Sequence, residues 1–348
     1  MKNLMLALSG GVDSSVALTL LKNEYNIIGA TMKLYDGAEA ACDEARSVAE
    51  RFGISHHVFD LKEQFKQKVI ESFVNSYISG ETPNPCVVCN KHIKFGAFLD
   101  CAESLGCDYF ATGHYARVEF DKASGRFLLK KALSPKDQSY VLYGLSQEQL
   151  SRIIFPLGDL KGDKKQVREL AREHGLNADK PDSQDICFIP DGDYAGYIER
   201  FIGKSFQSGD IIDKNGKLLG RHNGIINYTI GQRKGLGLAA PEPLYVTGKN
   251  AKTGTVTAGG SSELFSSRLT ARELNWIAFP ELKETLRLSA RTRYSGQEQP
   301  CTVSPTGENC VHVAFDSPQR ALTPGQSVVF YDEDVVIGGG TIQLTIDN

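Results

Sequence analysis

Residues 7–15 read ALSGGVDSS and lie between an apolar run at Asn3–Leu8 and a segment with helical spacing of valine and leucine. The two glycines let the backbone approach an anion closely, and the N–H groups at the start of a helix point toward it. The serine hydroxyls add donors, and Asp13 could position a metal ion that bridges phosphates. The Walker A phosphate loop is absent, because Ile198 stands where the Gly-Lys-Ser at 203–205 would need a glycine. The stretch therefore predicts a phosphate-binding turn between a strand and a helix.

Apolar strand patterns and helical patterns alternate along the first part of the chain. Such alternation is typical of a parallel sheet that is covered by helices and binds ligands at the carboxyl ends of its strands. We expect strands at Asn3–Leu8, Tyr25–Leu34, His56–Leu61 and Asp108–Thr112, and helices at Val12–Lys22, Ala38–Phe52, Glu63–Ile78 and Lys91–Leu105.

The pattern changes after about Phe201, where short strand candidates separated by turn signals replace the alternation. This favours one or two small antiparallel β-rich domains, the last of them a barrel. We expect an α/β domain at 1–200, a small central domain at 201–262 and a barrel domain at 263–348. The strand candidates near the end are Thr285–Tyr294, Cys301–Pro305, Cys310–Phe315, Gln326–Tyr331 and Val335–Leu344.

The composition is that of a globular protein. The 348 residues are 41% hydrophobic and 23% charged, which excludes disordered, collagen-like and coiled-coil classes. The net charge of −3 does not mark a nucleic-acid binder, although the stretches 214–240 and 283–293 are locally basic. The apolar run Leu4–Leu8 is too short for a signal peptide, and no run approaches the roughly 18 residues of a membrane span. We therefore expect a cytoplasmic protein without a membrane segment.

The cysteines carry the second chemical signal. Eight cysteines in a cytoplasmic chain are more consistent with reduced, metal-binding or catalytic thiols than with a disulfide framework. Cys86 and Cys89 lie in TPNPCVVCNK, a proline-stiffened loop that enters a helix, and the helix start with Lys91 and Lys94 predicts a thiolate at Cys89. Cys187 follows in SQDICFIP. A C-x-x-C pair could also be a redox pair or a zinc knuckle, but a knuckle would normally have a second pair or nearby histidines.

Seven stretches together resemble the bacterial and organellar tRNA-specific 2-thiouridylases, which are members of the PP-loop ATP pyrophosphatase superfamily. They run from Ala7 to Asp332 and read ALSGGVDSS, TPNPCVVCNKHIKFG, TGHYARV, KDQSYVLYGL, SQDICFIP, YTIGQRKGLGL and PGQSVVFYD. The resemblance implies a parallel-sheet α/β PP-loop domain, a small central domain and a C-terminal antiparallel β-barrel that contacts tRNA. It also implies ATP-dependent 2-thiolation of the wobble uridine (position 34) of tRNA. In that reaction the uracil 2-oxygen is adenylated with release of pyrophosphate and is then replaced by sulfur.

The same resemblance implies roles for individual residues. Cys89 would be the nucleophile and Cys187 the persulfide carrier, and the two would end each turnover as a disulfide that needs a reductant. Asn84, Pro85 and Cys86 would form the loop beside the target base. ATP with Mg²⁺ would bind at Ala7, Leu8, Ser9, Gly10, Gly11, Val12, Asp13, Ser14, Met32 and Gly113, and tRNA would contact His114, Lys136, Asp137, Gln138, Arg293, Tyr294 and Gln326.

The implied partners are the tRNAs for lysine, glutamate and glutamine, together with a sulfur-donor protein or cysteine desulfurase relay, and the enzyme would be a monomer.

One position departs from the family pattern, because most members read TPNPD where this chain has Cys86. The candidate acid/base carboxylate of that aspartate is therefore missing. Cys86, Cys89 and Cys187 could instead hold a 4Fe–4S cluster with one open iron that carries sulfide. At this point a persulfide alone and a cluster both stay open.

Two other functions are consistent with parts of the sequence. A different PP-loop enzyme, such as an amidating or ligating synthetase, explains residues 7–15 but leaves Cys86, Cys89 and Cys187 without a task. A cysteine-metallated RNA-binding module explains the basic stretches but not the nucleotide loop. Pyrophosphate release that depends on tRNA separates the predicted thiolation from both.

Overall fold

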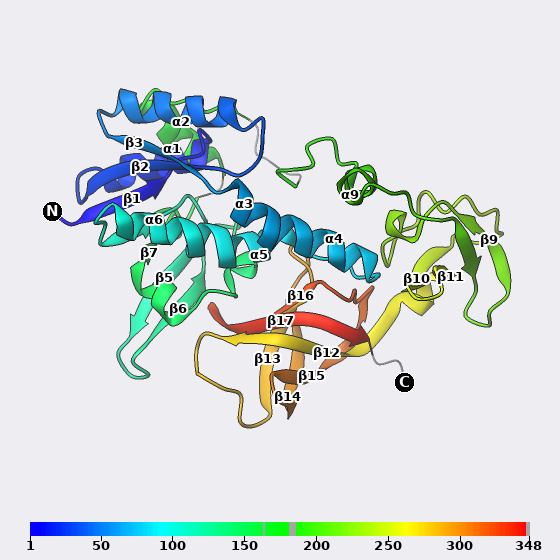
Figure 1. Ribbon diagram of the computed structural model, residues 1–348. Coiled ribbons are helices and arrows are strands. Elements are labelled where there is room, and N and C mark those ends of the chain that lie inside the picture. Colours follow the sequence, from blue (N-terminus) through cyan, green and yellow to red (C-terminus); the bar gives the residue numbers. More distant parts are fainter. Residues whose placement is uncertain (163, 181–185, 346–348) are drawn as a thin grey trace.

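The computed structural model of the chain describes residues 1–162, 164–180 and 186–345. An α/β unit, a small β-rich unit and a barrel follow one another along the chain. Figure 1 shows the β-rich unit (green to yellow) at one end of the molecule and the barrel (yellow to red) below the α/β unit. This architecture confirms the predicted fold class.

The α/β unit is built on a five-stranded parallel sheet with the strand order β3-β2-β1-β4-β7. Its central strand is buried on both faces, since Leu4, Met5 and Leu6 have no exposed surface. The four strands predicted here are confirmed to within one residue at each end. The strands are β1 (Asn3–Ala7), β2 (Asn26–Lys33), β3 (His56–Asp60), β4 (Tyr109–Ala111) and β7 (Ile153–Ile154).

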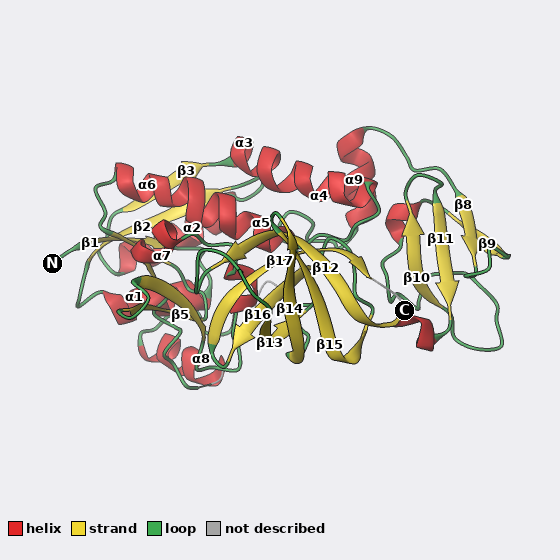
Figure 2. Cartoon of the chain, turned by 90° about the horizontal axis from the view of Figure 1, so that it is seen from below, coloured by secondary structure: helices red, strands yellow, loops and turns green. Residues whose placement is uncertain are grey.

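Helices cover both faces of this sheet (Figure 2). The predicted helix 63–78 is a continuous stretch with a π-helical turn, whereas the predicted start at Lys91 is wrong because the helix already begins at Pro85. The helices are α1 (Val12–Leu21), α2 (Glu39–Arg51), α3 (Lys62–Phe65), π-helical η1 (Lys66–Ile70), α4 (Glu71–Ile78), α5 (Pro85–Cys89), π-helical η2 (Asn90–Ala97), α6 (Phe98–Ser104), the short 3-10 helix η3 (Ser139–Leu142), α7 (Gln147–Arg152), α8 (Lys164–Glu173) and α9 (Tyr194–Ile202).

The C-terminal barrel closes on itself. Six antiparallel strands follow in the order β12-β15-β14-β13-β16-β17, and β12 pairs again with β17. Its interior is apolar, and Leu269, Val313 and Val328 have no exposed surface. No sequence pattern marked β12. The strands are β12 (Phe265–Trp276), β13 (Leu286–Arg291), β14 (Gln299–Gly307), β15 (Cys310–Arg320), β16 (Ser327–Asp332) and β17 (Val335–Thr345).

A hairpin within the first 200 residues belongs to the barrel sheet. Strands β5 (Ala116–Asp121) and β6 (Arg126–Lys131) pair with each other, and β6 pairs with β17. No local pattern predicted this hairpin, because its partner strand lies at the far end of the chain. The first 200 residues therefore add two strands to the sheet of the barrel, separate from the parallel sheet of the α/β unit.

The central unit is a four-stranded sheet of the order β10-β11-β8-β9. The prediction that its strands are all antiparallel is wrong, because β11 and β8 run parallel. The elements are β8 (Gly209–Ile212), β9 (Leu218–His222), η4 (Ile225–Asn227), β10 (Tyr245–Asn250), β11 (Thr255–Gly259) and η5 (Ser261–Leu264).

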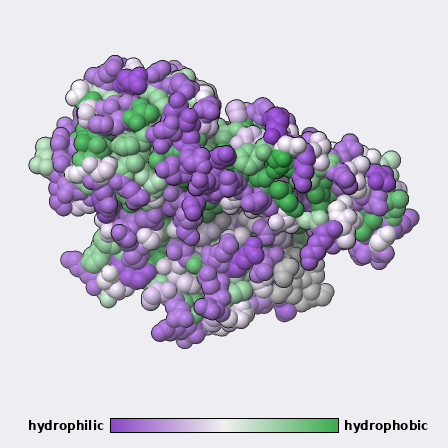
Figure 3. Space-filling model, in the orientation of Figure 1, coloured by the Kyte–Doolittle hydropathy of each residue, from purple (hydrophilic) through white to green (hydrophobic). Residues whose placement is uncertain are grey.

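The surface is predominantly polar (Figure 3). Apolar side chains gather in a small patch between α4 and α9. Ile78 of α4 and Phe201 of α9 are both more than a third exposed. Among the helices that the structure describes, none is long and apolar enough to cross a membrane.

Candidate functional site

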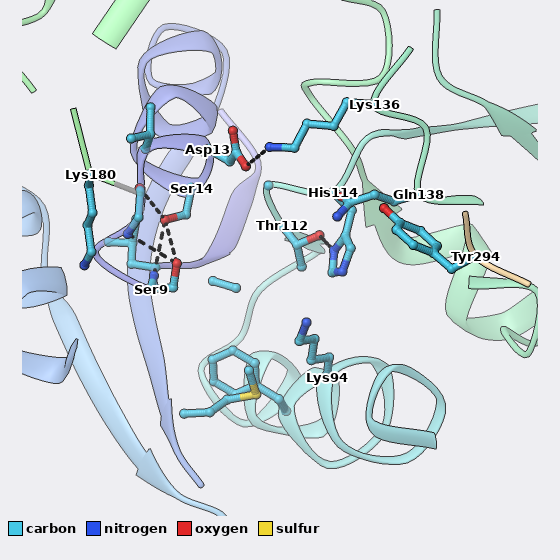
Figure 4. A pocket seen from close by; sticks show the side chains of 17 residues that line it. Ser9, Asp13, Ser14, Lys94, Thr112, His114, Lys136, Gln138, Lys180 and Tyr294 are labelled. Atoms are coloured by element: carbon cyan, nitrogen blue, oxygen red, sulfur yellow. Dashed lines mark hydrogen bonds and ion pairs between the residues drawn. The ribbon is translucent and has the colours of Figure 1, made fainter. Parts of the chain in front are cut away.

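A cavity of about 700 Å³ opens at the carboxyl ends of β1 and β4, the edge of the sheet where a ligand is expected. Figure 4 shows side chains that point into it from α1, from the loop after β4 and from η2. The predicted residues that the structure brings together on its wall are Ala7, Leu8, Ser9, Gly11, Val12, Asp13, Ser14, Met32, Gly113, His114, Lys136, Gln138 and Tyr294.

Glycine and serine shape the loop between β1 and α1. Gly10 has a φ of +67°, and a Cβ atom there would lie 2.7 Å from Cβ of Glu44, so a larger residue does not fit. The buried hydroxyl of Ser14 donates to the carbonyl of Gly11 at 3.1 Å, and it accepts from the amide of Ser9 at 3.3 Å. Helix α1 begins directly after Gly11, so its free N–H groups lie at the cavity wall. This is the geometry of a phosphate site.

Asp13 is the only carboxylate on the cavity wall among the residues that the structure describes. One of its oxygens accepts from the Tyr115 hydroxyl at 2.6 Å, and the other accepts from Nζ of Lys136 at 2.7 Å. The predicted tRNA residue Lys136 thus reaches the nucleotide loop. Mg²⁺ commonly binds one or two carboxylates together with substrate phosphates, so this donor fits a magnesium ion that enters with ATP.

Two further lysines line the cavity although no motif assigned them to it. Nζ of Lys180 donates to the carbonyl of Gly10 at 3.3 Å and pairs with Glu44. Lys94, half-buried on η2, points into the cavity toward Thr112 and His114 (Figure 4). A single lysine, whether in a helix like Lys94 or in a loop like Lys180, is usually a solvated surface residue, so only the fold reveals these positions.

The loop after β4 packs directly against the phosphate loop. A Cβ atom on Gly113 would lie 2.9 Å from the amide nitrogen of Ser14, so glycine allows this close approach. Next to it, Nδ1 of His114 and the hydroxyl of Thr112 lie 2.7 Å apart. Loss of solvent lowers the pKa of His114 well below its usual range, and Lys94 lowers it further, so the imidazole is neutral.

A helix cap and the barrel hold the cysteine loop, residues 82–84, which leads into the helix of Cys86 and Cys89. The Asn84 side chain accepts from the amide of Cys86 at 3.1 Å, and Pro85 occupies the first position of α5. The predicted tRNA residue Gln326 donates to the carbonyl of Thr82 at 2.7 Å and so ties this loop to the barrel. Cys86 is exposed.

The predicted thiolate at Cys89 is wrong for this structure. Because α5 starts at Pro85, Cys89 is the last residue of α5 and not its first, and only 7% of it is exposed. Burial raises the pKa of Cys89 to about 12, which outweighs the opposite effect of Lys94. The predicted second cation, Lys91, lines a separate cavity.

Cys187 lies near the other two thiols. It is exposed, yet the surrounding protein raises the pKa of its thiol, first by displacing solvent and second through Cys86. The Cys86 and Cys187 thiols each raise the pKa of Cys89 as well, so the three sulfurs are electrostatic neighbours. Of the surrounding motif, residues 183–185 lie outside the described residues.

As they lie in the structure, Cys86, Cys89 and Cys187 do not form a site for a metal cluster. Within residues 1–162, 164–180 and 186–345, no group of three or more His, Cys, Asp or Glu side chains is placed to hold a metal ion. The iron–sulfur cluster at Cys86, Cys89 and Cys187 stays a prediction, and no step is derived through it.

Several predicted tRNA residues make internal contacts. The Asp137 carboxylate accepts from the amides of Ala132 and Ser139, both at 3.1 Å. One guanidinium nitrogen of Arg293 donates to the carbonyl of Ala321 at 2.8 Å. Tyr294, by contrast, is 45% exposed at the cavity rim. Tyr294 therefore keeps an exposed side chain at the cavity, while Asp137 holds its own loop.

Comparison with known families defines the class of protein. Residues 2–191 match the family described as "tRNA methyl transferase HUP domain". Residues 195–260 match the "tRNA methyl transferase PRC-barrel domain", and residues 266–342 match the "Aminomethyltransferase beta-barrel domain". The fold and the cavity thus define an α/β nucleotide-binding protein with two appended β units.

Individual relatives narrow this class. The tRNA-specific 2-thiouridylase MnmA of Clostridioides difficile is 46% identical over 359 residues, covering 99% of each chain. That of Acetivibrio thermocellus is 47% identical and covers 98% of this chain and 99% of its own. The chain therefore belongs to the tRNA-specific 2-thiouridylase family. Among solved structures, the U34-tRNA thiolase NcsA from Methanococcus maripaludis with its 4Fe–4S cluster has a TM-score of 0.33 at 17% identity, covering 57% of this chain and 67% of its own.

Proposed function

We propose that this chain is a tRNA-uridine 2-sulfurtransferase that uses ATP to replace the 2-oxygen of the wobble uridine by sulfur. The observation that carries the proposal is a helical stretch that runs without a break from Pro85 of α5 to Phe95 of η2 and joins Cys86 and Cys89 to the nucleotide cavity. Cys86 and Cys89 lie on α5, and Lys94 on η2 lines the cavity of the phosphate loop. Activation by ATP and delivery of sulfur would therefore occur at adjoining sites.

The activation step follows from the chemistry of the phosphate loop. The N–H groups at the start of α1 and the lysines Lys136 and Lys180 would hold the triphosphate, and Mg²⁺ bound with it at Asp13 would offset the phosphate charge. The uracil 2-oxygen attacks the α-phosphorus, N3 of the uracil releases its proton to solvent, the bond to the β-phosphate breaks, and pyrophosphate leaves. AMP on the 2-oxygen makes a good leaving group of an oxygen that is otherwise a poor one.

The sulfur step uses the cysteines. The outer sulfur of a Cys187 persulfide attacks carbon 2 of the activated uracil, directly or as sulfide freed by Cys89, and AMP departs. Attack of Cys89 on the inner sulfur is ordinary thiol exchange. It leaves a Cys89–Cys187 disulfide, which a thiol reductant must open before the next turnover. The persulfide would be loaded by a sulfur-donor protein or cysteine desulfurase relay.

The proposed substrates are the tRNAs for lysine, glutamate and glutamine, bound by a monomer. RNA loops are commonly read by stacking of unpaired bases on aromatic side chains. Tyr294 is the exposed aromatic residue on the cavity wall, so it suits such stacking near the target uridine. Cys86 occupies the position beside that base.

The test combines two products in one assay. The purified protein, ATP, unmodified tRNA and a cysteine desulfurase with cysteine as the persulfide source should yield pyrophosphate and 2-thiouridine, measured by a coupled assay and by mass spectrometry of nucleosides. Pyrophosphate release without tRNA would favour an amidating or ligating synthetase, and tRNA binding without any pyrophosphate would favour a binding module. Iron and labile-sulfide analysis after anaerobic purification tests the cluster, since full thiolation without bound iron excludes a required one.

A further inference from the structure

Lys94 differs from the other two lysines of the nucleotide cavity. Lys136 is paired with Asp13, and Lys180 is paired with Glu44. The Lys94 ammonium has no hydrogen bond or ion pair with any residue in the described part of the chain, although the residue is half-buried. A cation that has no protein partner on the wall of a nucleotide cavity is available to an anion that arrives with the substrates.

Two sites lie within reach of this cation. Figure 4 shows Lys94 pointing from η2 toward Thr112 and His114 on the cavity wall. Along the same helical stretch it follows Cys89 by five residues, about one π-helical turn, and it lowers the pKa of both Cys89 and Cys187. Lys94 therefore lies on the wall of the nucleotide cavity and within electrostatic reach of the thiols.

We infer that Lys94 is a catalytic residue of the sulfur-transfer step, where its ammonium neutralises both the attacking sulfur anion and the phosphate of the adenylated uridine. This inference rests on the proposed function and names a residue that the activation step does not need. Two anions must approach each other in this step, and a cation between them removes most of their repulsion.

The step balances without any further reactant. The outer sulfur of the Cys187 persulfide forms the bond to carbon 2, and the bond from carbon 2 to the AMP oxygen breaks, with its electron pair leaving on AMP. Cys89 then attacks the inner sulfur of Cys187, and the sulfur–sulfur bond breaks. Its electron pair stays on the sulfur at carbon 2, and the Cys89 proton passes to N3 of the 2-thiouracil. Lys94 keeps its own proton throughout.

The same helix supplies a matched control. Lys91 is also on η2 but is exposed and lines a separate cavity of about 560 Å³ together with Lys68 and His92. Substitution of Lys91 removes the same charge from the same helix without touching the nucleotide cavity. Lys94→Arg keeps the charge and tests whether charge is what matters.

The experiment separates activation from transfer in the full-length enzyme. Enzyme loaded with persulfide is mixed with ATP and tRNA, and pyrophosphate and 2-thiouridine are followed in a single turnover. For Lys94→Gln we expect transfer to fall by about 100-fold, the size seen when one electrostatic donor is lost, with pyrophosphate release within about fivefold of wild type. Lys91→Gln should stay within about twofold on both products, and Lys94→Arg should recover most of the transfer rate.

Each outcome decides between roles. Equal transfer rates for Lys94→Gln and Lys91→Gln would overturn the inference. So would an equal loss of pyrophosphate release and transfer in Lys94→Gln, which would make Lys94 an ATP-binding residue only. Failure of Lys94→Arg to recover transfer would show that charge is not what the site requires. Absence of 2-thiouridine with the wild-type enzyme would instead refute the proposed function.

Discussion

The nucleotide cavity and the cysteine site share one helix but differ in how completely they are built. In the nucleotide cavity, Gly10, Ser14 and Asp13 already have the contacts that shape a phosphate site. At the cysteine site, Cys89 is buried as a neutral thiol and Cys187 is exposed. The fold thus organises activation in advance, and we expect transfer to need a rearrangement that tRNA brings about.

Removal of the sulfur carrier gives the largest expected effect and tests the separation of the two regions. Cys187→Ser should abolish 2-thiouridine formation, because serine cannot carry a persulfide, while tRNA-dependent pyrophosphate release continues in the first turnover. Nucleoside mass spectrometry and a pyrophosphate assay measure the two halves. Cys301→Ala, a buried barrel cysteine, is the control and should keep both activities. Full thiolation by Cys187→Ser would refute the persulfide route and the cluster alike.

The reverse experiment disables the nucleotide cavity. Asp13→Ala should lower pyrophosphate release by about 100- to 1,000-fold, because the substitution removes the cavity's carboxylate and frees Lys136 from its partner. Binding of tRNA, measured by filter retention, should stay nearly unchanged. Unaltered pyrophosphate release would show that this loop does not bind the phosphates of ATP.

A prediction of intermediate size concerns how the rate of alkylation of Cys89 depends on pH. Because its pKa is raised to about 12, the thiolate fraction should rise about tenfold for each pH unit between pH 7 and pH 9. Alkylation by iodoacetamide, followed by peptide mass spectrometry, should show this slope, and exposed Cys86 should react at least about tenfold faster at pH 7. Addition of tRNA with a non-hydrolysable ATP analogue should accelerate labelling of Cys89. Rapid labelling at pH 7 in the free protein would contradict a buried, neutral thiol.

Local patterns were sufficient for the parallel sheet and for the phosphate loop. Strand and helix periodicity located β1 and α1 to within one residue, since buried runs and glycine turns are features of nearby residues. They were not sufficient where the partner is distant in sequence. The hairpin β5–β6 pairs with β17, and Lys94 and Lys180 reach the cavity only after folding. The predicted Cys89 thiolate was wrong because burial depends on packing that no local motif describes.

The smallest expected effect concerns the contact through which the barrel holds the cysteine loop. Gln326→Ala removes the hydrogen bond to the carbonyl of Thr82, a loss of about 1 kcal/mol for an ordinary hydrogen bond. Since the loss falls on the cysteine loop and not on the nucleotide cavity, single-turnover transfer should slow by about two- to fivefold while ATP binding is unchanged. Gln319→Ala is the matched control, because that side chain is bonded only to the nearby carbonyl of Ser317 among the described contacts. Equal effects of the two substitutions on transfer would show that the barrel does not position the cysteine loop. An effect of Gln326→Ala on ATP binding would show that the nucleotide cavity and the cysteine site are less independent than their geometry indicates.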